Sequence, residues 1–206
     1  MAGTAVLSLV AASAPGADWY VATNGADFND GTNWAAAFLT VSNAVAHAQD
    51  GDSVVVSNGA YDVGVSSPIM LTNAVVLLGV GGASDTFLRG PYPASGRVLV
   101  ISNANAAVDG FTITNGNVTL WDPNWGGGVY LAGGALRNCR VVGNYTTDGN
   151  NAYGGGVFMS SGSISNCVIA GNYARAGHLR TTVGGGLYMS GGVIRDSRIE
   201  RNLAVG

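Results

Sequence analysis

Aromatic side chains gather in three segments of the chain, and their type points to sugar recognition. The segments cover residues 117–125, 145–153 and 173–183, and they contain Trp121, Trp125, Tyr145, Tyr153 and Tyr173. The whole chain is only 8% aromatic, so these segments hold more than their share. Flat aromatic faces suit the apolar faces of sugar rings, and exposed Trp or Tyr is costly unless it packs or binds. We therefore predict a glycan-binding edge made of these five residues, with Trp121, Trp125 and Tyr145 as its main contacts.

One loop carries side chains that could hold a metal ion. Asp27, Asn29 and Asp30 offer oxygen ligands of the kind that Ca²⁺ prefers. The spacing lacks the distant Glu of a calcium loop, and Asp, Asn and Gly are ordinary turn formers. We favour a plain turn and predict no metal or other cofactor, with Ca²⁺ at these three residues as the alternative.

The two cysteines occupy equivalent places in the repeating pattern, and we predict that they are buried thiols. Cys139 and Cys167 lie 28 residues apart, and the next equivalent position is Ser197. In-register neighbours on parallel strands are about 4.8 Å apart, whereas a disulfide needs its Cβ atoms at about 3.8 Å. A disulfide in an exported protein is the less favoured alternative. The two histidines, His47 and His178, stand in unrelated places, so a Cys/His metal site is not expected.

The elements that position these residues come from a sequence that repeats itself. Gly triplets at 126–128, 154–156 and 184–186 lie 28 and then 30 residues apart, and an aliphatic–aromatic–aliphatic run follows each. Periods of this length are typical of solenoids. The alternation has a period of two, so the aliphatic residues share one face of a strand, and Tyr130, Phe158 and Tyr188 share the other. A second unit recurs at 135–144, 163–172 and 193–202.

These repeats predict an all-β chain folded as a parallel β-helix of about 28–30 residues per coil, with two or three short strands in each. Asn144, Asn172 and Asn202 recur at one point of the repeat, and Asn138, Asn166 and Asp196 recur at another. Stacked Asn side chains can bond to one another and to the turn backbone, so we expect two polar ladders. The aromatic segments precede the Gly triplets, and we expect them to be loops projecting from one edge.

The N-terminal part differs from the repeats. Residues 1–17 are apolar and small, as in a secretory signal peptide, although a basic start is missing. Residues 18–52 should contain a strand, the turn-rich loop and a helix over Thr40–Gln49, with Thr40 as its cap, covering the end of the solenoid. The β-helix then spans 53–206, and its last repeat lacks a cap, so we expect the β-helix to be truncated there and the isolated chain to self-associate.

The sequence resembles known β-helix proteins at both ends. Four segments of this chain resemble the N-terminal region of secreted right-handed parallel β-helix proteins of the pectate-lyase-like superfamily. They are Tyr20-Val21-Ala22, 29–34, 50–56 and Gly59-Ala60-Tyr61. The Gly-Gly-x-Val or Gly-Gly-x-Leu and Val/Ile-x-x-Asn repeats resemble those of polymorphic outer-membrane proteins, with Gly in place of Ala and Val or Ile in place of Phe. The resemblance implies a right-handed β-helix, while one fold hosts many activities.

The resemblance also implies an alternative function, because enzymes on this fold include polysaccharide lyases and hydrolases. A hydrolase would need paired carboxylates, but Asp109, Asp122, Asp148 and Asp196 stand in different contexts. A lyase of this fold would use an Arg or Lys base, and because the chain has no Lys, only Arg remains. We therefore predict an adhesin-like or glycan-binding protein without catalysis in this segment. A polysaccharide-degrading enzyme, or the N-terminal part of one, is the alternative, and a passive spacer with packed aromatic residues is a third.

Charge and hydropathy limit the partners. All nine basic residues are Arg, none lies in the first 88 residues and no basic run occurs, so nucleic acid is not an expected partner. No segment predicts a transmembrane helix, because residues 1–17 are too short. We expect an extracellular or cell-surface location, at a bacterial outer membrane if the full protein carries an anchor, and a polysaccharide or surface glycan as partner.

Overall fold

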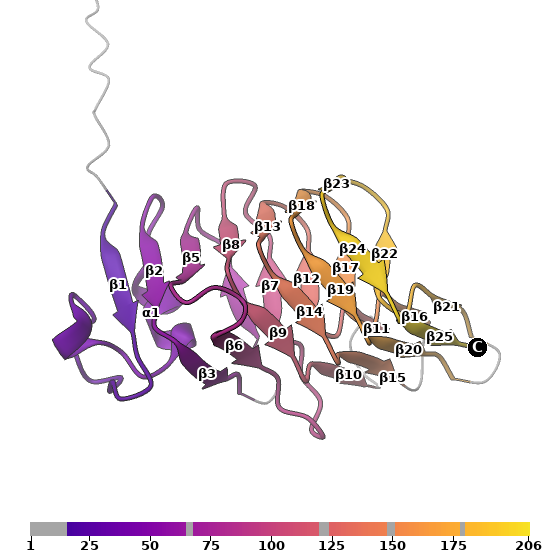
Figure 1. Cartoon of the computed structure of the whole chain (residues 1–206), viewed down its shortest axis with the longest axis horizontal. Helices are drawn as coiled ribbons and strands as arrows, with labels where there is room; N and C mark the ends of the chain where they lie inside the picture. Colours follow the sequence, from indigo (N-terminus) through magenta and orange to yellow (C-terminus); the bar gives the residue numbers. More distant parts are fainter. Residues whose placement is uncertain (1–15, 65–67, 120–123, 148–150, 178–179) are drawn as a thin grey trace, which may run out of the picture.

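The chain folds as a parallel β-helix, as predicted, in a computed structural model that describes residues 16–64, 68–119, 124–147, 151–177 and 180–206. Successive coils stack along the long axis of the molecule (Figure 1), and every pairing between named strands is parallel. Cα partners follow the repeat: Val108, Leu136, Ile164 and Ile194 are in register on neighbouring strands.

Three sheets form the walls of the solenoid. The seven-stranded sheet contains β1 (Asp18–Val21), β2 (Ser53–Val56), β5 (Val76–Gly79), β8 (Ala107–Asp109), β13 (Ala135–Arg137), β18 (Ser163–Ser165) and β23 (Val193–Arg195). The six-stranded sheet contains β3 (Gly59–Asp62), β6 (Thr86–Arg89), β9 (Thr112–Thr114), β14 (Arg140–Val142), β19 (Val168–Ala170) and β24 (Arg198–Glu200). The five-stranded sheet contains β4 (Ile69–Leu71), β7 (Leu99–Ile101), β12 (Val129–Leu131), β17 (Val157–Met159) and β22 (Leu187–Met189).

Within the described residues the ends of the aromatic segments are strands, where the sequence had predicted loops. They form a four-stranded sheet of β10 (Asn117–Thr119), β15 (Tyr145–Thr147), β20 (Tyr173–Arg175) and β25 (Leu203–Val205), and a three-stranded sheet of β11 (Asn124–Trp125), β16 (Ala152–Tyr153) and β21 (Thr182–Val183). A spacing of 28 or 30 residues lets the ends of each segment pair with their copies in the next coil, and this pairing gives the backbone N–H and C=O groups partners. A regular coil therefore has five short strands, rather than two or three.

The core consists of aliphatic columns that run through the coils. Leu131 and Met159 are in register and fully buried, as are Val141 and Ile169. Burying each side chain of this size contributes about 1.5–3 kcal/mol. Cys139 and Cys167 belong to the same core and are free thiols, as favoured from the sequence. The Cys139 backbone N–H donates to the Cys167 sulfur at 3.4 Å, and burial raises the pKa of the Cys139 thiol.

The N-terminal end is covered by the predicted helix. Helix α1 (Val41–His47) buries Val41 and Ala44 and packs against β1, β2 and β4. Thr40 is its cap, as predicted, because its hydroxyl accepts from the Asn43 N–H at 3.3 Å. A short 3₁₀ helix, η1 (Trp34–Ala36), precedes it. Within the described ranges no helix has the length and apolar character needed to cross a membrane, and the predicted signal peptide lies almost entirely outside them, at residues 1–15.

The first polar ladder forms as predicted, and the second forms between Asn138 and Asn166. Asn144, Asn172 and Asn202 stack so that each Oδ1 accepts from the preceding coil: Asn144 Nδ2 donates to Asn172 at 3.0 Å, and Asn172 Nδ2 donates to Asn202 at 3.0 Å. In the second ladder, Asn166 Nδ2 donates to Asn138 Oδ1 at 2.7 Å. Asn138, Asn166 and Asp196 adopt φ values of 50°, 51° and 48°. Asn and Asp tolerate this left-handed conformation better than most residues, which explains their recurrence there.

Candidate functional site

Two of the five predicted contact residues meet on the four-stranded sheet. Tyr145 and Tyr173 are Cα partners on β15 and β20, and their ring centroids lie 6.4 Å apart. The residues after them, Thr146 and Ala174, are buried. Because side chains alternate along a strand, the inward position of Thr146 and Ala174 turns both tyrosine rings outward. The two central strands of the sheet thus display their aromatic rings in register, between Asn117 on β10 and Leu203 on β25.

A third tyrosine completes this row, and the sequence had not singled it out. Tyr92 lies in the segment before β7, and its ring centroid is 5.3 Å from that of Tyr145. It is 55% exposed. Two backbone hydrogen bonds between Gly96 and Asn117, at 2.7 and 2.9 Å, fix its segment against β10. In the sequence Tyr92 stands between two prolines. Because this segment has no counterpart in the repeats, the repeat pattern could not identify Tyr92 as part of the row.

The three rings border a shallow groove of about 480 Å³, which we call the tyrosine groove. Its lining is Tyr92, Pro93, Asn117, Thr119, Tyr145, Thr147 and Tyr173. Asn117 is held in place, because its Nδ2 donates to the Pro93 carbonyl at 3.1 Å and its Oδ1 accepts from the Thr147 hydroxyl at 3.5 Å. The groove thus combines flat apolar faces with amide and hydroxyl groups, which is the usual character of small-molecule and sugar sites.

Trp125 and Tyr153 lie in a different cluster. Trp125 stacks on Phe158 with a centroid distance of 4.5 Å and an interplanar angle of 9°, and Tyr153 contacts Tyr188 at 4.9 Å. Phe158 belongs to the outward ladder of Tyr130, Phe158 and Tyr188 on the five-stranded sheet, and Trp125 covers it so well that it is only 6% exposed. Trp125 and Tyr153 therefore pack on this ladder, and Arg97 lies over Tyr130 at 5.5 Å.

The structure thus divides the predicted edge into two aromatic clusters. Tyr145 and Tyr173 line the tyrosine groove, Trp125 and Tyr153 pack on the aromatic ladder, and Trp121 lies outside the described residues. The division follows from the strand pairing, since β15 and β16 belong to different sheets. Sequence spacing alone had placed all five on one edge.

The calcium candidates bond to protein groups. Asp27 accepts from the Leu39 and Thr40 N–H groups at 3.0 and 2.8 Å and from the Thr40 hydroxyl at 2.8 Å. Asn29 Nδ2 donates to the Ala37 carbonyl, and Asp30 accepts from Thr32. Hydrogen bonds from the Thr32 N–H and hydroxyl lower the pKa of Asp30. Among the described residues, no three His, Cys, Asp or Glu side chains are grouped so as to hold a metal ion.

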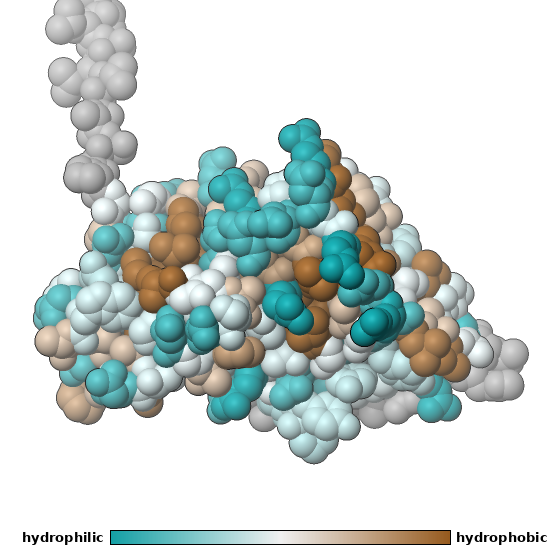
Figure 2. All heavy atoms as spheres, in the orientation of Figure 1, coloured by the Kyte–Doolittle hydropathy of each residue, from teal (hydrophilic) through white to brown (hydrophobic). Residues whose placement is uncertain are grey.

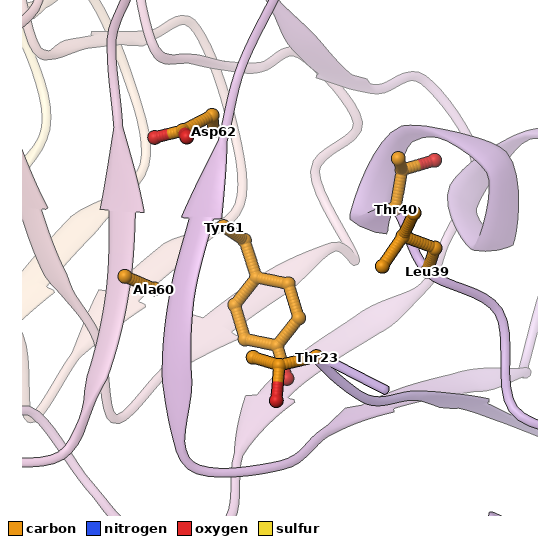
Figure 3. A pocket seen from close by; sticks show the side chains of 6 residues that line it. All are labelled: Thr23, Leu39, Thr40, Ala60, Tyr61 and Asp62. Carbon is orange, nitrogen blue, oxygen red and sulfur yellow. The ribbon is translucent and has the colours of Figure 1, made fainter. Parts of the chain in front are cut away.

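A smaller hollow of about 260 Å³ lies between β3 and the start of α1 (Figure 3). Its polar groups are already engaged: the Tyr61 hydroxyl bonds to Ser57 Oγ at 2.8 Å, and Asp62 forms an ion pair with Arg89 at 2.8 Å. The Thr40 hydroxyl likewise donates to Asp27. Two carboxylates elsewhere are also engaged, since Asp109 accepts from Asn138 and Glu200 pairs with Arg198.

Comparison with known proteins adds a likeness of fold. No protein-family model and no curated protein sequence matches the chain. Among solved structures, it is similar to pectin methylesterase PemA from Erwinia chrysanthemi, with 14% identity, a TM-score of 0.49, and coverage of 89% of this chain and 67% of that one. A pectin methylesterase mutant bound to a hexasaccharide shows 17% identity, a TM-score of 0.49, and coverage of 92% and 67%. This likeness concerns the fold, which the strand pairing already establishes, and it does not decide the reaction or the substrate.

Proposed function

We propose that this chain is a polysaccharide-binding β-helix protein and that the tyrosine groove is its contact surface. The observation that carries the proposal is the row of Tyr92, Tyr145 and Tyr173, with centroid spacings of 5.3 and 6.4 Å. Successive sugar rings of an extended polymer advance by a distance close to this spacing, so neighbouring rings of one chain could meet neighbouring tyrosines. A solenoid provides such a row because its coils repeat at about 4.8 Å.

The polar lining supports sugar rather than purely apolar ligands. Thr119 and Thr147 stand beside the rings, and their hydroxyl groups can exchange hydrogen bonds with sugar hydroxyls. Asn117 is 7% exposed and holds the Pro93 segment in place. A sugar ring that packs on a tyrosine buries apolar surface, at about 25 cal/mol per Å². Each tyrosine is therefore a weak contact, and a polymer that covers several of them binds more tightly. Proteins that bind extended ligands gain affinity from several such sites in a row.

We propose that the groove binds polysaccharide without cleaving it. The described side chains of the groove include no carboxylate, whereas hydrolysis of a glycosidic bond uses a pair of them. The second candidate function, a polysaccharide-acting enzyme, agrees better with the names of the similar solved structures, which are pectin methylesterases. We further propose an extracellular or cell-surface location, for which the apolar residues 1–17 are the sequence argument.

A glycan array followed by product analysis tests the proposal. The wild-type chain should bind one or more polysaccharides, and the bound polymers should be recovered unchanged after long incubation. Absence of binding to any polysaccharide would remove the proposed function and leave the passive spacer. Release of methanol, reducing ends or unsaturated sugars would instead establish the enzyme.

A further inference from the structure

Arginine side chains concentrate on one face of the C-terminal coils. Arg140 and Arg198 are on β14 and β24 of the six-stranded sheet, and Arg137 and Arg195 lie beside them at the ends of β13 and β23. Arg201 follows β24 directly. All five are exposed, and we call them the arginine face. In Figure 2, strongly hydrophilic side chains lie over the part of the surface formed by β13, β14 and β24, with apolar side chains between them.

The arginine face is positive in a protein that is negative overall. Its carboxylates are Asp109, Asp196 and Glu200, so five arginines against three carboxylates leave a formal charge of +2. The whole chain has a formal net charge of −3. Opposite charges are thus separated along the solenoid, and a positive surface of this kind attracts anionic partners at low ionic strength.

Most of these guanidinium groups have no carboxylate partner. Arg198 pairs with Glu200 at 2.7 Å, but within the described part of the chain Arg137, Arg140, Arg195 and Arg201 form no ion pair. Asp109 is the register partner of Arg137 on β8, yet its Oδ1 accepts from the Asn138 amide at 2.6 Å. Guanidinium groups present a rigid fork of donors that fits carboxylate or sulfate oxygens in pairs.

The spacing of the arginines is regular. Arg140, Val168 and Arg198 are successive Cα partners, and so are Arg137, Ser165 and Arg195. Each pair of arginines is therefore two strands apart, or about 10 Å along the axis. A straight array with a fixed repeat suits a linear polymer whose anionic groups recur along its length. The arginines also lie on two neighbouring sheets, so a flat membrane surface would meet only part of the set.

We propose that the arginine face binds an acidic polysaccharide through its carboxylate or sulfate groups. This site is separate from the tyrosine groove, which lies on the four-stranded sheet, and it stands or falls independently of the proposed function. The Asp196 carboxylate should repel an anionic polymer at this site. It occupies the position of Asn138 and Asn166 in the exposed ladder and lies between Arg195 and Arg198 in the sequence.

Binding of labelled alginate, heparin and neutral dextran at low and high salt tests this inference. Wild type should bind alginate, heparin or both at low salt and lose the binding at high salt, while dextran should not compete. Binding of alginate but not heparin would identify carboxylate as the group that the arginines bind. Binding of heparin but not alginate would identify sulfate. Arg137→Gln/Arg140→Gln should weaken binding about tenfold or more, because each substitution removes a guanidinium that donates charge-assisted hydrogen bonds to the polymer. Asp196→Asn should strengthen it.

Matched controls make the result decisive. Arg89→Gln/Arg180→Gln removes the same formal charge outside the arginine face and should change binding little. Equal thermal melting confirms that the exposed substitutions leave the fold intact. The inference is overturned if neither acidic polymer binds, if the control double variant loses as much affinity, or if vesicles of anionic lipid bind more tightly than either polymer.

Discussion

At the scale of single residues, a few polar side chains are buried because each satisfies several backbone groups at once. Asn172 is 1% exposed and bonds to Asn144, Asn202 and the Val141 carbonyl. Asn202 donates to the Ile169 carbonyl and has a ladder neighbour on one side only among the described residues. A buried polar group that loses its hydrogen-bond partner lowers the stability of the fold. The ladder positions therefore favour Asn, whose side chain both donates and accepts.

We expect Asn172→Ala to destabilise the protein more than Asn202→Ala. The first substitution leaves unpaired groups on both neighbouring coils, at about 1–3 kcal/mol per group, and the second affects one side. Urea titrations of both variants measure the difference in the free energy of unfolding. Equal or reversed losses would show that the ladder does not stabilise the coils in this way.

Asp52 connects the first strand to the end of the capping helix. Its carboxylate accepts from the Gln49 N–H and Trp19 Nε1, both at 2.9 Å, and from the Ala17 N–H at 2.7 Å, and these hydrogen bonds lower its pKa. A lowered pKa in the folded state means that this stabilisation is present above the unfolded value of about 3.9 and is lost as the pH falls through the folded value.

Asp52→Asn should therefore reduce stability at neutral pH and weaken the dependence of stability on pH in the acid range. Thermal melting of wild type and variant between neutral pH and the acid limit of folding measures this. A variant whose melting temperature falls with acid as steeply as that of wild type would exclude Asp52 as the responsible group.

At the scale of elements, the Gly triplets let neighbouring segments approach closely. A Cβ atom at Gly155 would overlap the carbonyl oxygens of Tyr173 and Gly185, whereas one at Gly171 would meet nothing. Gly171 has a φ of 61°, which Asn tolerates. Glycine is therefore needed at Gly155 because the backbones of neighbouring segments, including that of Tyr173, come too close for a side chain.

Gly155→Ala should destabilise the fold by about 1–3 kcal/mol or more, since crowding in a close-packed site costs this much. Gly171→Asn is the matched control and should change stability little. Denaturant titration compares the two variants. If the Gly155 variant were as stable as the control, the close approach would not constrain the sequence.

The sequence predicted the elements that repeat and missed those without a pattern. The strands around Val129, Leu136 and Val141 were predictable, because in-register aliphatic columns recur with a clear period of two. The strands of the aromatic segments have only two or three residues, several of them polar, so nothing distinguished them from loops. Tyr92 comes from a less regular coil, and its approach to Tyr145 depends on three-dimensional pairing that sequence spacing does not show.

At the scale of the whole molecule, the two ends of the solenoid differ. Helix α1 covers the first coils, while β22, β23, β24 and β25 each pair on one side only among the described residues. Val193, Ile199 and Leu203 on these strands are 46%, 49% and 55% exposed. Unpaired strand edges beside apolar side chains are templates for association.

We expect the isolated 206-residue chain to self-associate through these edges. Sedimentation velocity should show a larger species that grows with concentration, and Ile199→Lys should weaken it, because a charge on the edge opposes pairing. Tyr145→Ala, on the groove, is the control and should not change the assembly. A strictly monomeric chain at high concentration would contradict this expectation.

The central claim is that the tyrosine groove binds polysaccharide, and calorimetric titration tests it most directly. An oligosaccharide of the polymer found on the array would be titrated into wild type, Tyr145→Ala/Tyr173→Ala, and Phe28→Ala as a control on a 92% exposed aromatic residue outside the groove lining. Loss of the apolar surface of two tyrosine rings, at about 25 cal/mol per Å², should weaken binding by about tenfold or more, while Phe28→Ala should bind as wild type does. Unchanged affinity in a correctly folded double variant would contradict the account.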